Sequence, residues 1–401
     1  MDVSLFVDGK TGDLVEISGS DPRLGEWRHV AFRPWPLPPE CPQLSGSTYR
    51  AVADARAALA ALDSTSRRLP NPTLLRLPTL RREAQATASL EGTYAPLADV
   101  YAADQDAQQS PEMREILNYL TMASCAFDTV ADGRPLSVPL LEDLQRLLVA
   151  GTNLEGRSSG KVRDTQVVIG LRAGALPSEH AIHSARFIPP PPGSDLVSDL
   201  RTLVSWVGAD HRGQIDPVVV AAMSHYQFET LHPFHDGNGR IGRLLVILQL
   251  LATGVLREPT LTISPWFEAR RGDYYDRLFD VSAAGDWDAW VGFFAEGLRA
   301  SAESTLAQML DLVEVQVGLK DRIRGSSLRA ETALALVDVA VAYPVFSVRR
   351  AATELGVSIG RANTLVNQLV DLGVLEVDGQ DTYNRRFRAP AVLDVLLRRT
   401  S

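Results

Sequence analysis

The chain has 401 residues, of which 45% are hydrophobic and 22% charged, and its formal net charge is −9. This composition predicts a globular protein of two or three domains and excludes a molecule devoted to binding polyanions. The apolar runs are shorter than a membrane span, and the N-terminus lacks the pattern of a signal peptide. The two distant cysteines, Cys41 and Cys125, fit a reducing compartment, so we expect a cytoplasmic protein.

The first hundred residues predict a hairpin, a strap and two helices. Residues 1–20 alternate around Asp8 and Gly9, as in a short hairpin. Residues 34–42 are rich in proline, which restricts φ and cannot donate a hydrogen bond, so we expect an extended strap over a surface or a linker. An amphipathic helix is expected over 46–64. After an interruption by prolines, Pro78 suits the first turn of a second helix that ends before Gly92.

A hairpin is expected to interrupt the helical region that follows. Helices are predicted over 110–130 and 136–150, the second opening at Ser137. Residues 165–169 then have strand character, and residues 186–188 form a returning strand after a turn-rich stretch. The pattern predicts a β-hairpin flap in a chain that is otherwise mainly α.

The next helix leads into a polar stretch. Asp216 and Pro217 suit the N-cap and first position of a helix that runs to Leu231. A buried helix ending near Gly254 follows the polar stretch, and residues 270–318 are predicted to be helical again.

The C-terminal residues 328–401 predict a separate module. Helices over 329–342 and 359–372 flank a segment at 346–355, and two strands follow around Asp378 and Gly379. This order is typical of a winged helix-turn-helix. Its arginines are largely offset by acidic residues, and such modules also mediate dimerisation, so DNA and a second copy of the chain are both candidate partners.

The polar stretch carries the residue types that phosphoryl transfer needs. Its members are His232, Asp236, Gly237, Asn238, Gly239, Arg240 and Arg243. A histidine is a natural general base near neutral pH, and a carboxylate suits Mg²⁺. Glycines let backbone N–H groups approach phosphate, and guanidinium groups suit the β- and γ-phosphates. The following helix would add the positive end of its dipole, so we predict a nucleotide phosphate site.

The stretch resembles the signature of the Fic family, His-x-Phe-x-(Asp/Glu)-Gly-Asn-Gly-Arg-x-x-Arg, with a match at every position from His232 to Arg243. The resemblance extends to the approach to the flap at 160–163, to the proline run at 187–192, and to Tyr274. It implies a Fic helical core with a β-hairpin flap, an N-terminal extension and a C-terminal winged helix.

The resemblance also implies an activity, the transfer of AMP from ATP to a Ser, Thr or Tyr hydroxyl of a protein. His232 would take the hydroxyl proton, and Asp236 would hold Mg²⁺ between the α- and β-phosphates. The amides of 237–239 would stabilise the transferring group, Asn238 would orient the α-phosphate, and Arg243 would grip the γ-phosphate. Tyr275 is the candidate contact for the nucleoside, with core packing as its alternative.

A second motif resembles the family's inhibitory pattern, Ser/Thr-x-x-x-Glu-Gly/Asn. Thr87 and Glu91 are four residues apart and share one helix face, and Gly92 follows. The C-terminal end of a helix disfavours an anion unless a cation compensates. The resemblance implies that Glu91 pairs with Arg243 and thereby displaces the γ-phosphate.

The flap is expected to bind the target protein. The residues proposed as an exposed edge for a target segment are Thr165, Gln166, Val167, Val168 and Ile169. We therefore predict an N-terminal inhibitory region at 1–105, a catalytic core at 106–318 and a winged helix at 328–401. The alternatives are an enzyme that removes AMP and a DNA-binding regulator that senses nucleotide.

Overall fold

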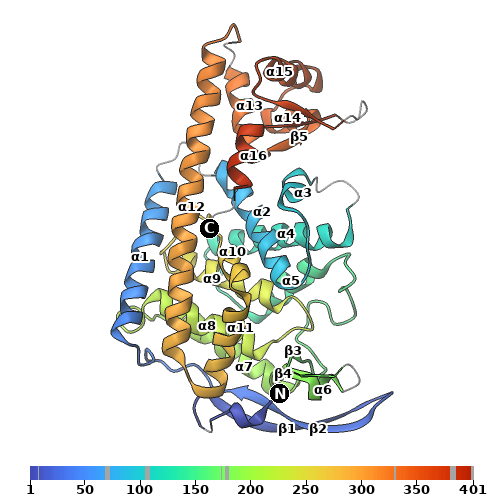
Figure 1. Ribbon diagram of the computed structural model, residues 1–401, viewed down its shortest axis with the longest axis vertical. Coiled ribbons are helices and arrows are strands. Elements are labelled where there is room, and N and C mark those ends of the chain that lie inside the picture. The colour runs from blue at the N-terminus through green and yellow to red at the C-terminus, as the bar shows by residue number, and fades with distance from the viewer. Residues whose placement is uncertain are drawn as a thin grey trace. The chain divides into compact units, whose positions relative to one another are not determined.

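The computed structural model is mostly helical, which confirms the predicted fold class (Figure 1). It describes residues 1–7, 9–67, 73–103, 109–172, 174–176, 180–328, 331–379 and 385–398. The chain divides into two compact units. Unit 1 comprises Met1–Ala58, Thr121–Arg257 and Trp266–Ala300, and unit 2 comprises Leu59–Leu120, Glu258–Pro265 and Ser301–Ser401. Within the described ranges, no helix is long and apolar enough to cross a membrane.

Unit 1 begins with a β-hairpin that lies further along the chain than predicted. Strand β1 (Gly12–Asp21) pairs antiparallel with β2 (Gly25–Pro34) over their whole length. The Asp21 carboxylate accepts hydrogen bonds from the backbone N–H groups of Arg23 and Leu24 at 2.7 and 3.0 Å and so closes the turn. The predicted hairpin around Asp8 and Gly9 is wrong, because Gly9 lies in a turn with a φ of 69° but the paired strands begin only at Gly12. Asp8 lies outside the described residues. An aspartate-stabilised turn and ten-residue strands outweigh the weaker alternation nearer the terminus.

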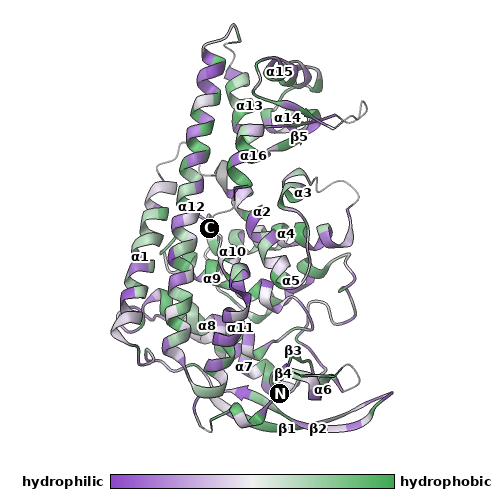
Figure 2. Ribbon diagram, viewed as in Figure 1, coloured by the Kyte–Doolittle hydropathy of each residue, from purple (hydrophilic) through white to green (hydrophobic). Residues whose placement is uncertain are grey.

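The helices of unit 1, whole or in part, are η1 (Val3–Leu5), α1 (Gly46–Ser66), α4 (Pro111–Ala131), α5 (Val138–Val149), α6 (Ala181–Ser184), α7 (Ser194–Val207), α8 (Pro217–Leu231), α9 (Asn238–Ala252), α10 (Ser264–Ala269), α11 (Arg271–Ala284) and α12 (Trp287–Arg324). Ser137 and Asp216 cap α5 and α8 as predicted. Figure 2 shows hydrophobic and hydrophilic residues interleaved along α12, as expected for a helix with one buried face.

The proline-rich segment is the extended strap that the sequence predicts. Residues 35–45 form neither helix nor strand. The Trp206 indole donates to the Pro38 carbonyl at 2.9 Å, and the Gln227 amide donates to the Trp35 carbonyl at 2.9 Å. The strap therefore runs over α7 and α8.

The centre of unit 1 is formed by α8 and α9. All but two residues of each helix are buried. A helix that is apolar on every side can be stable only when other elements surround it. The loop between these two helices, residues 232–237, is the first part of the polar stretch and therefore joins two buried helices.

The flap contains a shorter hairpin than predicted. Strand β3 (Ile169–Leu171) pairs with β4 (Ala185–Phe187), and α6 lies between them. The predicted strand over 165–169 is wrong except at Ile169. In this register, residues 165–167 would face prolines 189–191, which have no N–H to donate, so the ladder stops.

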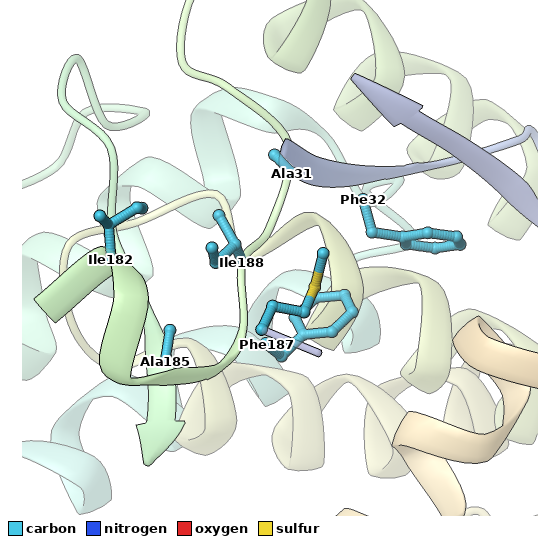
Figure 3. Close-up of a cluster of buried hydrophobic side chains, with 7 residues drawn as sticks. Ala31, Phe32, Ile182, Ala185, Phe187 and Ile188 are labelled. Atoms are coloured by element: carbon cyan, nitrogen blue, oxygen red, sulfur yellow. The ribbon is translucent and has the colours of Figure 1, made fainter. Parts of the chain in front are cut away.

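A buried hydrophobic cluster joins the N-terminal hairpin to the flap (Figure 3). Its members are Met1, Ala31, Phe32, Ile182, Ala185, Phe187 and Ile188. The Phe32 N–H also donates to the Ile188 carbonyl at 2.9 Å. Figure 3 shows residues of β2, α6 and β4 gathered in this cluster, so the hairpin and the flap are parts of one packed structure.

Unit 2 contains the helix that carries the predicted inhibitory motif. Helix α2 (Thr73–Leu90) begins before Pro78, so the predicted start at Pro78 is wrong, while residues 71–72 lie outside the described residues. Pro78 therefore lies inside the helix, where its φ is compatible with helix but its missing N–H removes one backbone hydrogen bond. Helix α3 (Leu97–Ala102) and the first part of α4 follow.

The C-terminal part of unit 2 combines helices with a small sheet. Its elements are α13 (Glu331–Ala342), β5 (Val345–Ser347), α14 (Val348–Leu355), α15 (Ile359–Asp371), β6 (Glu376–Asp378), β7 (Arg386–Arg388) and α16 (Pro390–Leu396). The antiparallel sheet has the strand order β5-β7-β6. Strand β5 and helix α16 were not predicted, and residues 329–330, 380–384 and 399–401 lie outside the described residues.

Candidate functional site

His232 occupies a strained position at the end of α8. Its φ of 47° and ψ of 59° are left-handed, and its N–H donates to the Phe228 carbonyl at 3.0 Å. Among the described residues, it alone combines a positive φ with a side chain. Such a conformation costs roughly 1–2 kcal/mol and persists only where surrounding contacts impose it. Tertiary contacts, rather than a local preference, therefore hold the backbone that carries the half-buried imidazole.

Arg163 supplies those surrounding contacts. Its Nε donates to the His232 carbonyl and its backbone N–H to the Pro233 carbonyl, both at 2.8 Å. Its guanidinium also donates to the carbonyls of Thr165 and Leu231 at 3.2 and 3.4 Å. A cation suits the negative C-terminal end of α8. Burial lowers the pKa of Arg163 to about 10, so the group stays charged at neutral pH.

No functional role is predicted for Arg163 from the sequence. It lies in the segment that approaches the flap, and a single arginine in a polar loop is most often exposed. Its burial appears only once α8 and the flap are brought together.

The loop after His232 is closed by one side chain. The Asn238 amide oxygen accepts from the Phe234 N–H at 2.9 Å, and the Asn238 amide nitrogen donates to the Phe234 carbonyl at 2.8 Å. Phe234 is fully buried and anchors the loop. The Asn238 side chain therefore shapes the loop, and its predicted contact with the α-phosphate stays a prediction.

Gly237 is required at the start of α9. Its φ is 86°, and a Cβ at this position would lie 2.7 Å from Cδ2 of Leu148 on α5. The residue precedes Asn238, Gly239 and Arg240, which form the first turn of the helix and carry its first backbone N–H groups. Such N–H groups have no partner within a helix and can bind an anion.

Asp236 and Arg240 form an ion pair across one turn of the helix start. The Arg240 side chain is 2% exposed and the Asp236 side chain is 40% exposed, so the carboxylate reaches solvent while the guanidinium does not. The Gln145 amide donates to the Asp236 carbonyl at 3.3 Å and fixes the loop against α5. The described part of the chain has no group of three or more metal-ligating side chains.

Arg243 is fully buried on α9, beside a histidine that the sequence did not single out. Burial and the charge of Arg243 lower the pKa of His225 to about 3, so His225 is neutral at physiological pH. The His225 Nε2 lies 2.7 Å from the Tyr274 hydroxyl. Tyr275 is half-buried, and its ring centroid lies 5.1 Å from that of Tyr274. The predicted nucleoside contact thus adjoins Tyr274, the partner of His225.

The predicted inhibitory residues lie at the end of α2, in unit 2. Thr87 is fully buried, Glu91 is exposed, and Gly92 has a φ of 92°. The backbone N–H of Gly92 donates to the Ser89 carbonyl and that of Thr93 to the Ala88 carbonyl, the Schellman arrangement that a C′ glycine permits. Gly92 therefore ends the helix as predicted. The pairing of Glu91 with Arg243 stays a prediction.

A buried carboxylate fixes the same helix within unit 2. Glu83 is 1% exposed and accepts from the backbone N–H groups of Ile263 and Ser264 at 2.8 and 3.0 Å. Two turns before Glu91, the helix is thus tied to the segment 258–265. The end of α2 has a defined position in its unit.

Comparison with known proteins gives two family matches. The Fic/DOC family N-terminal model matches residues 49–128, and the Fic/DOC family model matches residues 135–250. Over 157 residues, the chain is 30% identical to protein adenylyltransferase fic-1 of Caenorhabditis elegans, and this match covers 39% of the chain and 26% of the relative. Protein adenylyltransferase Fic of Culex quinquefasciatus is 35% identical over the same shares. The chain thus spans about a quarter of the length of the curated relatives it matches, 26% in each case.

A solved structure supports the fold. The Fic family protein from Desulfovibrio desulfuricans G20 is similar with a TM-score of 0.54 at 21% identity, and the match covers 88% of this chain and 98% of that one.

Proposed function

The chain belongs to the Fic/DOC family, and on that premise we propose that it is a protein adenylyltransferase, which transfers AMP from ATP to a protein hydroxyl. One observation carries the proposal. His232 is held in a left-handed conformation directly before the loop that opens α9, so a base and an anion-binding helix start share one loop.

In the proposed reaction, the oxygen of a Ser, Thr or Tyr hydroxyl attacks the α-phosphorus of ATP. His232 accepts the hydroxyl proton as the new O–P bond forms. The bond from the α-phosphorus to the bridging oxygen breaks, and pyrophosphate leaves with the electron pair. The contacts of Arg163 to the His232 and Leu231 carbonyls would keep the imidazole in place.

The start of α9 would hold the phosphates. Backbone N–H groups from Gly237 to Gly239 would stabilise charge on the transferring group, and Asn238 would orient the α-phosphate. Arg240 and Arg243 would bind the β- and γ-phosphates. Tyr275 would contact the nucleoside, since it adjoins Tyr274, whose hydroxyl contacts His225 near Arg243.

Asp236 would hold Mg²⁺. A single, partly exposed carboxylate fits a magnesium ion whose other ligands are phosphate oxygens and water, and does not fit an ion held by protein alone. When bound, the ion would neutralise charge on the phosphates. The Arg240 guanidinium, paired with the same carboxylate, would orient it.

The end of α2 would regulate the reaction. We propose that the Glu91 carboxylate competes with the γ-phosphate for Arg243, with Thr87 and Gly92 setting the helix end. The Schellman arrangement at Gly92 supports this role, because it fixes the backbone that carries Glu91. The flap residues 165–169 would bind the target segment.

The C-terminal residues 328–401 would form a winged helix, following a regulatory region at 1–105 and a core at 106–318. Its sheet arginines are neutralised locally, since Arg386 pairs with Asp378 and Arg388 with Glu376. This pairing weakens the case for DNA binding. A cytoplasmic location and a homodimer remain predictions from the sequence.

Mass spectrometry of the Glu91→Gly protein after incubation with ATP and Mg²⁺ would test the reaction. We expect an added AMP that disappears in the Glu91→Gly, His232→Ala double variant. An unchanged mass in the single variant would contradict the proposal. Loss of AMP from an adenylylated protein, without transfer, would favour the AMP-removing alternative.

A further inference from the structure

A groove of about 710 Å³ lies between β1 and the flap, within unit 1. One wall is formed by residues 16–21 of β1 and by Trp27 of β2. The other is formed by residues 164–168, before β3, together with the start of α6 and with Pro191 and Pro192. The hydrophobic cluster of Figure 3 holds the two walls together.

The wall of β1 presents the edge of a strand. Six consecutive residues line the groove, although successive side chains of a strand point to opposite faces. Consecutive residues of one strand are expected to line a groove only where the edge of that strand borders it. In the part of the chain that the structure describes, β1 pairs with β2 alone, so its other edge can receive an additional strand.

An aromatic ring completes this wall. Trp27 lies opposite Gly19 in the hairpin register, and a Cβ on Gly19 would lie 2.4 Å from the indole. The absence of a side chain at Gly19 lets the indole lie against β1. The groove therefore offers an apolar surface beside a main-chain edge, as sites for extended peptides do.

The charge of the groove selects its occupant. Glu16, Asp21 and Asp164 line it, and none of the described lining residues is lysine or arginine. Glu16 and Asp164 are exposed. Negative charge disfavours phosphate and acidic segments and attracts basic ones.

One end of the groove adjoins the predicted catalytic loop. Asp164 lies 3.2 Å from His235 of that loop. The preceding residue, Arg163, contacts the His232 and Pro233 carbonyls at 2.8 Å. A segment lying along the groove would therefore be directed towards His232.

We propose that this groove binds an extended segment of the target protein that contains lysine or arginine, paired with the edge of β1. The proposal rests on the proposed function in taking this segment as the acceptor of AMP. The target-binding surface then includes β1 as well as the flap. Its negative charge makes a basic, extended segment the preferred acceptor.

Fluorescence anisotropy of the full chain without ATP would test it. The probe is a fluorescein-labelled peptide of alternating lysine and threonine, long enough to span residues 16–21. We expect binding to the wild type and about fivefold weaker binding or more to Glu16→Lys. Glu314→Lys makes the same change of charge at an exposed site on α12, outside the groove, and is expected to bind like the wild type.

Two altered peptides separate charge from strand pairing. A glutamate-threonine peptide is expected not to bind, and a lysine-threonine peptide methylated on alternate backbone nitrogens is expected to bind weakly. Equal binding of all three peptides, or equal loss in both variants, would overturn the proposal, and so would a chain dimer that excludes the peptide. Because the measurement needs no AMP transfer, binding without transfer would retain the groove and refute the proposed reaction alone.

Discussion

Helix α9 begins, and helix α2 ends, at a glycine with positive φ, but the two ends hold their carboxylates differently. At the start of α9, Asp236 pairs with a buried arginine of the same turn, near the positive end of the dipole. At the end of α2, Glu91 is exposed at the negative end, where a carboxylate is electrostatically unfavourable. The first arrangement stabilises its own helix, whereas the second is better explained by a role outside the helix.

Replacement of His232, in the loop that leads to the start of α9, is expected to have the largest effect. His232→Asn should lower AMP transfer about 10²–10⁴-fold, because asparagine tolerates the left-handed backbone but cannot act as the base. Incorporation of labelled AMP in a Glu91→Gly background would measure it. His235→Asn, in the same loop, is the matched control. Retained activity in His232→Asn would mean that the loop has another base.

Replacement of Arg163 tests what holds that loop. Arg163→Lys should lower the free energy of unfolding by about 2–4 kcal/mol, because a lysine cannot reach several carbonyls at once. Denaturant unfolding would measure the change. Arg157→Lys, at an exposed position before the same segment, should change it little. Equal stability of both variants would show that the contacts of Arg163 are dispensable.

Neutralisation of Glu91 tests the second helix end. Glu91→Gln should raise AMP transfer about tenfold, equivalent to ~1.4 kcal/mol, because the amide competes poorly for a guanidinium. Initial rates of self-labelling would show this. Glu112→Gln removes another exposed carboxylate of unit 2 and should leave the rate unchanged. A rise in both variants would point to general charge rather than to this helix end.

The last prediction concerns the pH dependence of stability that is due to His225. Its pKa of about 3 lies below the ordinary value of 6.5, so the unfolded chain binds its proton first as the pH falls. The stability due to neutral His225 is present above pH 6.5 and is lost towards pH 3. Between pH 6.5 and 5, the wild type should lose about 1–2 kcal/mol more than His225→Gln. His211→Gln is the control, and parallel losses in all three proteins would contradict the prediction.

The sequence predicted best what depends on local chemistry. The caps at Ser137 and Asp216, the end of α2 at Gly92 and the turn before α9 all follow from residues within a few positions. The signature at 232–243 is likewise one continuous segment, formed by the loop 232–237 and the first residues of α9.

Contacts between distant segments were not predictable in this way. The flap strand shortens because prolines 189–191 face it, and that register is visible only in the folded hairpin. Arg163 and His225 acquire their roles from neighbours far along the chain. The N-terminal hairpin lies further along the chain than predicted because the Asp21 carboxylate closes its turn, a contact that alternation does not reveal.

The burial of α8 and α9 has a consequence for how heat would affect the protein. Because nearly every residue of both helices is covered, neither helix has a surface on which it could persist once unit 1 opens. The geometry around His232 should therefore survive warming unchanged until unit 1 melts, and then vanish in the same transition. A temperature profile of activity would end abruptly, without the gradual decline of a site built on a mobile surface loop.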